Sequence, residues 1–250
     1  MKKYLFILIL ILTFASLSAS NLNTVENPTA ALLNAGEARI SQIIYKENGM
    51  MFCVDVGLFE AFQIGVGYGA EHLVGDKEPE WHEYPVVKAR VRIVEETFTT
   101  PAMAVGVDTQ GHGAYHKGTN RFDIKSKGAY FVLSKNYDMM GLIGFDAGAN
   151  YTFENTKGDQ DWDIFAGVYK TLGESFTLFA DFSAGLNDTQ GKDHKHDMIS
   201  GRGRTYLNTA FQWNITDQFA LKFLMHDLLK NKRTTELFDR SIVLDYRWFF

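Results

Sequence analysis

The chain has 250 residues and a formal net charge of -5 at pH 7. This acidic balance argues against nucleic-acid binding, which requires a basic surface. Cys53 is the only cysteine, so the chain builds no disulfide framework, and 20 Phe, 11 Tyr and 22 Gly against 4 Pro suit a fold with many strands.

The first twenty residues carry a targeting pattern. Lys2 and Lys3 precede an apolar run from Tyr4 to Leu12, and small residues from Ala15 to Ser20 follow it. We interpret residues 1–20 as a cleaved secretory signal peptide, because the apolar run is too short to span a bilayer comfortably. The alternative is a retained N-terminal anchor helix.

The remainder of the chain contains no run near the about 20 consecutive apolar residues of a transmembrane helix. The mature chain is therefore either soluble or crosses a membrane as a barrel, since only a closed barrel pairs every backbone group of its strands in lipid. We expect residues 21–35 to form a periplasmic lead-in and residues 36–250 to form one barrel domain.

Strand-like runs follow one another from Gly36 onward, with almost no helical pattern between them. They predict an all-β fold, a single closed antiparallel transmembrane β-barrel of about twelve strands. The predicted strands are Gly36 to Lys46, Met50 to Leu58, Ala61 to Glu71, Tyr84 to Glu95, Pro101 to Thr109, Gly128 to Asn136, Gly141 to Phe153, Asp161 to Leu172, Ser175 to Leu186, Thr205 to Ile215, Gln218 to Leu229, and Asp239 to Phe250.

The lengths of the links between these runs alternate. Links after even-numbered strands are short, whereas links after most odd-numbered strands are long and polar, as in His72 to Glu83, Gln110 to Lys127 and Asn187 to Arg204. Short turns at one rim and long loops at the other are typical of bacterial outer-membrane barrels. The pattern thus favours the cell outer membrane of a Gram-negative bacterium as the location.

Charged residues decide which face of each strand meets lipid. In the strand from Tyr84 to Glu95, Lys88, Arg90 and Arg92 alternate with apolar or small residues. Turning a Lys or Arg toward lipid at mid-depth costs about 2 to 4 kcal/mol, so the charged row faces the lumen. The runs Gly36 to Lys46 and Gly128 to Asn136 fit this rule poorly, whichever of their two faces is taken to point into the lumen. The predicted lumen lining is Lys88, Arg90, Arg92, Asp108, Asp146, Asp163, Asp181, Lys222, Asp245 and Arg247.

When the charged rows face the lumen, several aromatic side chains gather near the rim that carries the short turns. Such a belt is the interfacial girdle of a membrane barrel, whereas a soluble barrel would scatter the same residues through its core. The predicted girdle is Phe176, Phe211, Trp213, Phe219, Trp248 and Phe250.

The end of the chain, Tyr246-Arg247-Trp248-Phe249-Phe250, has a terminal aromatic residue and apolar residues at alternate positions before it. It resembles the C-terminal strand that the outer-membrane barrel assembly machinery recognises. This resemblance implies that Tyr246, Trp248 and Phe250 form an assembly signal and that the assembly machinery is a partner.

A second resemblance covers Pro28-Thr29-Ala30 through Gly36-Glu37-Ala38-Arg39-Ile40, then Val56 to Phe59, and Pro101 to Asp108 followed by Gly111. These segments look like the YjbH-type barrels associated with exopolysaccharide export. The resemblance implies a role in moving or anchoring a secreted polysaccharide, with polysaccharide export components as partners.

The mixed charges of the predicted lumen allow two functions. One is a channel for the passage or export of a polar solute, including polysaccharide. The other is a structural or assembly barrel whose lumen is closed by cross-strand ion pairs and whose loops bind a partner, since about twelve strands lie between the filled barrels of eight and the open channels of sixteen. Outer-membrane lipids and lipopolysaccharide are the expected surroundings in either case.

Histidines in the long links are candidate metal ligands. His194 and His196 lie between Asp193 and Asp197, and His112 and His116 lie in another link. Surface loops of this composition are more often solvated than bound to metal, and no supporting pattern of ligand-orienting residues is visible. We therefore expect no metal site and no cofactor.

An outer-membrane hydrolase is the enzymatic alternative. His226 and Asp227 lie at an outer strand end near Ser241, which is the arrangement that acyl transfer requires if the three side chains meet. No nucleophile motif surrounds Ser241, so we expect no enzyme and assign no catalytic residue.

Overall fold

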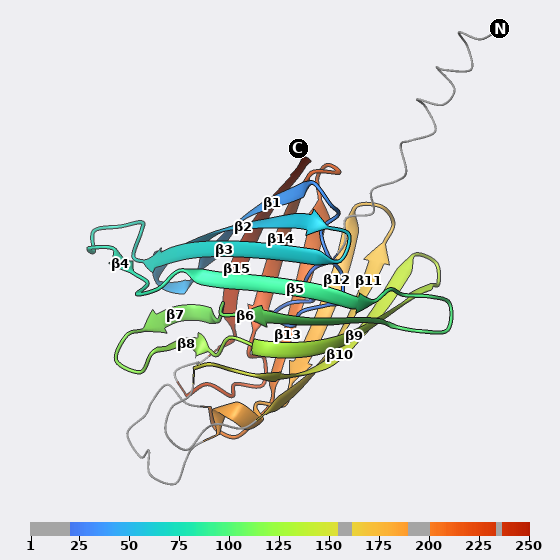
Figure 1. The fold of residues 1–250 in the computed structure, drawn as a ribbon. Helices are drawn as coiled ribbons and strands as arrows, with labels where there is room; N and C mark the ends of the chain where they lie inside the picture. The colour runs from blue at the N-terminus through green and yellow to red at the C-terminus, as the bar shows by residue number, and fades with distance from the viewer. Residues whose placement is uncertain (1–20, 155–161, 190–200, 234–236) are drawn as a thin grey trace, which may run out of the picture.

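The computed structural model describes residues 21–154, 162–189, 201–233 and 237–250, so the predicted signal peptide at residues 1–20 lies outside the described part. One barrel contains most of the strands (Figure 1). Its wall strands are β1 Glu37–Tyr45, β2 Gly49–Phe59, β3 Phe62–Glu71, β5 Val86–Val94, β6 Ala102–Asp108, β9 Gly128–Asp138, β10 Leu142–Tyr151, β11 Asp163–Leu172, β12 Phe176–Ser183, β13 Tyr206–Asn214, β14 Phe219–His226 and β15 Asp239–Phe249.

The wall is a closed antiparallel ring. The sheet contains 13 strands, and because β4 (Glu80–Trp81) only extends it at the end of β3, twelve strands make the wall. β1 pairs with β15 from Glu37 opposite Phe249, and β2 pairs with β3, which closes the ring. Closure removes the free strand edges that an open sheet would expose in lipid. The predicted fold is confirmed, and every wall strand overlaps its predicted range.

Burial follows the period-two alternation along the wall. On β5, Val87 and Val91 are exposed on the outside at 50% and 40%, whereas Arg90 between them is 6% exposed. On β3, Val66 is exposed while Gln63 is buried, and the glycines facing inward leave room for side chains of β2. The apolar face of each ribbon therefore points outward and the polar face points into the lumen.

The structure explains why β1 and β9 did not show one clearly polar face in the sequence. The inward faces of β1 and β9 mix polar side chains with buried Tyr45, Tyr130 and Val132. Tyr130 and Val132 pack with Ala30, which comes from the segment before the barrel, and Tyr45 packs with Phe122 of the link between β6 and β9. These strands contact protein inside the lumen rather than water, so their inward faces are not uniformly polar.

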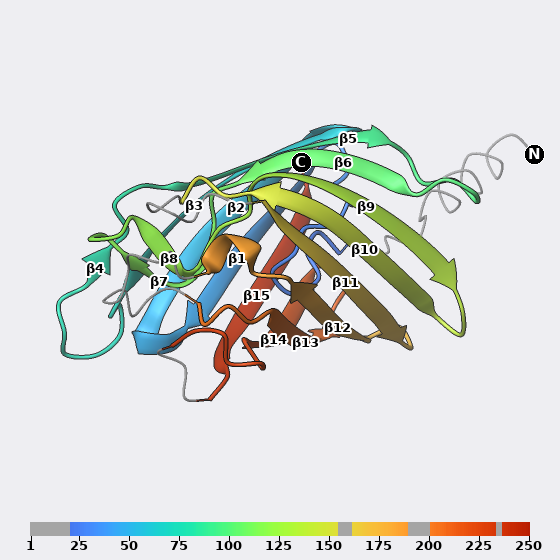
Figure 2. The same cartoon turned by 90° about the horizontal axis from the view of Figure 1, so that it is seen from below.

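Residues 21–35, here called the inner segment, do not precede the barrel as the expected periplasmic lead-in. They run through the lumen, where Leu22, Thr24, Asn27 and Leu33 are at most 2% exposed. Figure 2 shows the segment in dark blue, enclosed by the wall strands. The expectation was wrong because inward-facing polar side chains of the wall bind the backbone of this segment, as described below.

The link from residue 109 to residue 127 also contains structure that the sequence pattern did not predict. β7 (His112–His116) and β8 (Arg121–Ile124) pair with each other and form a second, two-stranded sheet, here called the mouth hairpin. It lies at the end of the barrel opposite the C-terminus (Figure 1). Two short 3-10 turns, η1 (Lys46–Asn48) and η2 (Leu186–Asp188), complete the described elements. Within the described residues, no helix is long and apolar enough to cross a membrane.

Candidate functional site

The inner segment is anchored by one carboxylate of the wall. Asp181 Oδ2 on β12 accepts hydrogen bonds from the backbone N–H groups of Val25, Glu26 and Asn27 at 2.9, 2.7 and 3.0 Å, and from the Thr24 hydroxyl at 3.1 Å. Successive backbone N–H groups that converge in this way form an anion-binding concavity. Asp181 thus holds the segment mainly through its backbone.

Cations of the wall hold the carbonyl groups of the same segment. Arg90 Nη1 donates to the carbonyl oxygens of Leu22 and Ala31, both at 2.8 Å. Lys222 Nζ donates to the carbonyl oxygen of Thr24 and, at 3.3 Å, to that of Asn23. Three residues predicted to line the lumen, Asp181, Arg90 and Lys222, therefore serve as anchors for a segment inside it.

The structure places the other predicted lining residues around the inner face of the wall. Asp146 accepts a hydrogen bond from Ser134, and Asp163 accepts one from the Leu186 N–H at 3.1 Å. Arg92 lines a cavity near the short-turn rim and donates to the Glu60 carbonyl oxygen at 2.9 Å. The remaining four line a cavity further inside, and they are Lys88, Asp108, Asp245 and Arg247.

Sequence reasoning missed an ion pair between β1 and β2. Arg39 Nη2 lies 2.7 Å from Asp55 Oδ2, and the Asp55 side chain is 1% exposed. Asp245 of β15 lies 3.9 Å from Arg39 and accepts a hydrogen bond from Ser41 at 2.5 Å. The available signal was the alternation of Arg39 and Ser41 with apolar residues, which the apolar positions further along β1 obscured.

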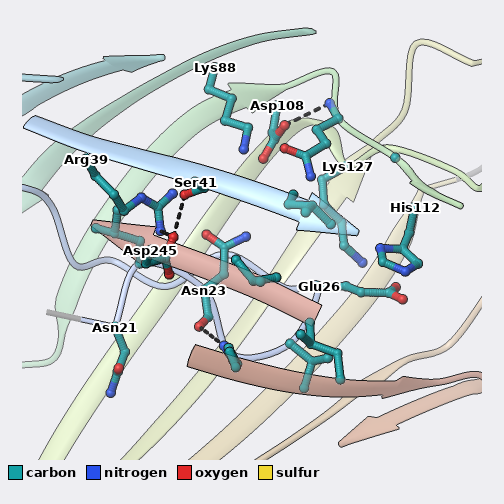
Figure 3. A pocket seen from close by; sticks show the side chains of 18 of the residues that line it. Asn21, Asn23, Glu26, Arg39, Ser41, Lys88, Asp108, His112, Lys127 and Asp245 are labelled. Atoms are coloured by element: carbon teal, nitrogen blue, oxygen red, sulfur yellow. Dashed lines mark hydrogen bonds and ion pairs between the residues drawn. The ribbon is translucent and has the colours of Figure 1, made fainter. Parts of the chain in front are cut away.

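A cavity of about 110 Å³ lies between the inner segment and the mouth hairpin (Figure 3). Glu26 contributes to its lining from the inner segment, and His112 contributes from the mouth hairpin. Cations outnumber anions among its lining side chains. The cations are Arg39, Lys88, Lys125, Lys127, Lys222 and Arg247, and the anions are Glu26, Asp108 and Asp245.

Lys125 and Lys127 were not predicted to line the lumen because they follow β8 in a stretch expected to be a surface link. Lys125 Nζ donates to the Asn187 carbonyl oxygen at 2.6 Å, and Lys127 Nζ donates to the Ser183 hydroxyl at 2.8 Å. These contacts turn the end of the link inward. A second cavity, of about 310 Å³, lies near the short-turn rim and includes Arg92 and Asp146 in its lining.

Buried charges fasten the mouth hairpin to the loops around the rim. Arg121 and Asp188 form a two-pronged pair at 2.8 and 3.1 Å, and their side chains are 1% and 2% exposed. Tyr206 donates a hydrogen bond to the same carboxylate at 2.5 Å. Burial raises the pKa of Asp188, but the charge and hydrogen bonds of Arg121 outweigh it, so the net pKa lies below the usual value.

Asp123, a buried carboxylate on the hairpin itself, lies close to three basic side chains. Its oxygens lie 2.5 Å from Lys46 Nζ, 3.1 Å from Lys232 Nζ and 3.0 Å from His116 Nε2. Burial raises the pKa of Asp123, but the His116 hydrogen bond and the two lysine charges hold it well below its usual value. Lys46 and Lys232 come from opposite ends of the chain, so Asp123 ties the hairpin to two separate loops.

The predicted girdle residues lie on the outer face at the short-turn rim. Phe176 stacks on Phe211 with ring centroids 5.4 Å apart, and Trp213 lies 6.3 Å from Phe176. Trp248 stacks on Tyr246 at 6.1 Å, and Phe250 is 75% exposed. Phe219 pairs with Tyr246 across β14 and β15. These positions suit an interfacial belt.

The candidate histidines separate into different environments. His194 and His196 lie outside the described residues, as do Asp193 and Asp197. His116 binds Asp123. His112, at the start of β7, lies against His226 of β14 with ring centroids 3.5 Å apart.

The residues considered for a hydrolase are only partly brought together. His226 Nε2 lies 2.8 Å from Ser241 Oγ, and His226 Nδ1 lies 2.6 Å from Glu26 Oε1. Asp227 instead accepts hydrogen bonds from the backbone N–H groups of Asn231 and Lys232. Ser241 is 4% exposed and lines neither of the two cavities described above. The geometry therefore gives the serine a partner without space for a substrate beside it.

No family model matches the chain, and no curated protein matches it. Among solved structures, an outer membrane channel from Pseudomonas putida F1 aligns with a TM-score of 0.51 at 10% identity, covering 92% of this chain and 100% of that one. The KdgM porin aligns at 0.49 and 6% identity, over 86% of this chain and 99% of that one. The NanC porin aligns at 0.47 and 9% identity, over 85% and 99%.

The likeness to the Pseudomonas putida channel is a likeness of fold. It agrees with the closed wall and the apolar exterior described above. The chain is a transmembrane β-barrel of the outer-membrane type, located in the outer membrane.

Proposed function

We propose that this barrel is a channel for small polar solutes that carry negative charge. The observation that carries the proposal is the cavity of about 110 Å³ inside the lumen, in which six Lys or Arg side chains face three carboxylates. A cleft with an excess of one charge and low-dielectric walls attracts ions of the opposite sign. The outer membrane channel fold of the structural neighbour supports passage through the barrel.

Lys88 is the cation best placed to meet a solute. It lies on β5, projects toward the cavity opposite the inner segment, and has Asp108 as its neighbour across the β5–β6 pair (Figure 3). Arg90 and Lys222, by contrast, are occupied by carbonyl oxygens of the inner segment. Lys88 is therefore the residue at which a change of charge should alter ion selectivity without releasing the inner segment.

A solute can pass only if the inner segment and the mouth hairpin move out of its path through the lumen. The inner segment is held by hydrogen bonds to Asp181, Arg90, Lys222 and Ser134, and a solute carboxylate competes for the same cationic donors. We therefore treat the described state as the closed state of the channel, with the inner segment as its plug.

Planar-bilayer recording of the full mature barrel tests this proposal. We expect discrete openings whose reversal potential in a KCl gradient shows a preference for chloride, and a weaker preference in Lys88→Glu. Lys77→Glu makes the same charge change in an exposed loop and is the matched control. A barrel lacking residues 22–34 should conduct more than the intact one. Cation preference in the intact barrel, or an equal effect of both substitutions, would contradict the proposal.

A structural barrel with a closed lumen is the second candidate, and the filled lumen favours it. The inner segment and the mouth hairpin occupy the space between the wall strands, and buried ion pairs fix the hairpin. Absence of any conductance both in the intact barrel and in the barrel without residues 22–34 would support this candidate over the channel.

We further propose that the solute is an acidic saccharide. The YjbH-type resemblance points to polysaccharide, and a cavity lined by more cations than anions suits an acidic sugar more than a neutral one. The test adds acidic or neutral oligosaccharides of equal length to the same bilayer and measures how far each blocks the conductance. Block by the acidic sugar alone is expected, and equal block by both would remove the charge argument.

The C-terminal aromatic residues support a further proposal about assembly. Tyr246 and Phe250 are exposed on the outer face, where lipid and the barrel assembly machinery can reach them. Phe250→Ala should lower the fraction of folded, heat-modifiable barrel in the outer membrane, whereas Leu237→Ala, in an exposed loop, should leave it unchanged.

A further inference from the structure

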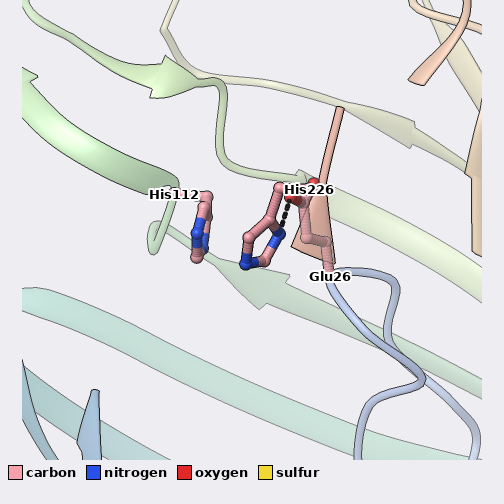
Figure 4. A group of neighbouring side chains, drawn as sticks. All are labelled: Glu26, His112 and His226. Atoms are coloured by element: carbon pink, nitrogen blue, oxygen red, sulfur yellow. Dashed lines mark hydrogen bonds and ion pairs between the residues drawn. The ribbon is translucent and has the colours of Figure 1, made fainter. Parts of the chain in front are cut away.

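Three potential metal ligands from distant parts of the chain meet inside the lumen. They are Glu26 of the inner segment, His112 of the mouth hairpin and His226 at the end of β14 (Figure 4). One ligand atom from each lies within 4.8 Å of the other two. Two imidazoles and one carboxylate form a ligand set that suits divalent transition metals, zinc above all.

Ordinary packing does not account well for the position of His112. Its ring lies 3.5 Å from that of His226, centroid to centroid, with the planes tilted by 30°. No hydrogen bond to a ring nitrogen of His112 occurs among the described residues, although the side chain is half-buried. A bound cation would give these nitrogens a partner and would draw the two rings together.

A neighbouring hydroxyl orients the second histidine. Ser241 Oγ lies 2.8 Å from Nε2 of His226, which leaves Nδ1 facing Glu26 at 2.6 Å. Metal-binding histidines usually donate their other ring N–H to such a partner, and that contact fixes the tautomer and the ring direction. Ser241 therefore acts as a positioning residue for His226.

The cluster is accessible from the cavity. Glu26 and His112 line the cavity of about 110 Å³, so a cation and its remaining water ligands have space on that side. Lys127 and Lys232 oppose a cation electrostatically, while Glu26 itself and the nearby Asp181 and Asp239 favour one. Because the surrounding charges are of both signs, selectivity for a metal ion has to come from the ring nitrogens of His112 and His226.

We propose that Glu26, His112 and His226 form a binding site for one divalent transition-metal ion, with a fourth position open to the cavity. The three ligands belong to the inner segment, the mouth hairpin and the wall. A bound ion would therefore join the two bodies that fill the lumen to each other and to the barrel. This inference does not depend on whether the barrel conducts.

Zinc binding to the folded full-length mature barrel, freed of metal with a chelator, tests the site. Isothermal titration with Zn²⁺ should show one equivalent bound, and His112→Ala and His226→Ala should each weaken binding at least tenfold. His116→Ala is the matched control, because His116 lies on the same hairpin and already binds Asp123. Heat-modifiable migration establishes that each variant is folded.

A spectroscopic measurement separates coordination from a general effect on structure. Cu²⁺ bound to the wild-type barrel should show nitrogen hyperfine coupling in electron paramagnetic resonance, with one nitrogen fewer in His112→Ala. Glu26→Gln should weaken Zn²⁺ binding while both nitrogens remain. No binding to the folded wild-type barrel, or equal binding to His112→Ala, would overturn the proposal.

Discussion

The inner segment and the mouth hairpin fill the same lumen but are held in different ways. The inner segment is bound largely through its backbone, by Asp181 on its N–H groups and by Arg90 and Lys222 on its carbonyl groups. The hairpin is bound mainly through its charged side chains, by buried ion pairs of Arg121 and Asp123, and among the described residues only two of its backbone N–H groups, those of Tyr115 and Phe122, donate to carboxylates around it. Backbone binding tolerates sequence change in the segment, whereas each buried ion pair depends on two particular residues.

The largest expected effect is loss of the Arg121–Asp188 pair. Arg121→Ala leaves Asp188 buried without its counter-charge, and breaking a buried pair in this way costs about 3–5 kcal/mol. Hydrogen exchange of the β7 and β8 amides should report this loss as easier opening of the hairpin. Arg204→Ala, at an exposed arginine, should leave the exchange unchanged. Unaltered exchange in Arg121→Ala would show that the pair does not hold the hairpin.

A smaller effect is expected at the anchor of the inner segment. Asp181→Asn keeps the size of the side chain but removes the charge that three N–H groups share, and hydrogen bonds to a charged group contribute about 1.5–3 kcal/mol. The inner segment should become cleavable by protease while the wall stays folded. Asp163→Asn, also a buried wall carboxylate, should not expose it.

A single neutral contact to the inner segment should matter less. Gln63 Oε1 accepts a hydrogen bond from the Leu33 N–H at 3.0 Å, and Gln63→Ala should cost about 1 kcal/mol. The protease assay should then show an effect between wild type and Asp181→Asn. A larger effect for Gln63→Ala than for Asp181→Asn would contradict the view that the carboxylate is the main anchor.

Mild acid should have almost no effect on the hairpin. A carboxyl whose pKa is lowered by folding stabilises the fold above its unfolded pKa and loses this contribution only as the pH falls through its folded pKa. Because the pKa values of Asp123 and Asp188 lie below the usual 3.8, docking should persist at pH 4. A dye on Gly118→Cys in a Cys53→Ser background, at an open position of the hairpin turn, should show no change from pH 7 to pH 4.

The wall of the barrel and the two bodies that fill its lumen differ in how far the sequence predicts them. The wall was predictable because alternation along β3 and β5 has a fixed period, and because Lys88 and Arg90 cannot face lipid at low cost. Asp181 and Lys222 were placed in the lining from the same alternation. Their role as anchors was not predictable, since the groups they bind are backbone N–H and carbonyl groups that every residue carries.

The filling of the lumen was not predictable for a related reason. The inner segment has no period, and the strands of the mouth hairpin are short, with Gly113 in a left-handed conformation inside the first of them. The meeting of Glu26, His112 and His226 depends on how both bodies fold into the barrel, and these residues are far apart in the sequence. Only apolar residues on the inward faces of β1 and β9 signalled that something packs there.

A thiol cross-link tests most directly that the inner segment occupies the lumen. Asn27 Oδ1 lies 3.0 Å from the Ser183 hydroxyl, whereas Phe182 points to the outside of the wall. In a Cys53→Ser background, a short bis-maleimide should join Asn27→Cys to Ser183→Cys in the folded barrel and should not join Asn27→Cys to Phe182→Cys. A folded barrel in which neither pair is joined, with Asn27→Cys freely labelled by a bulky maleimide, would contradict the account.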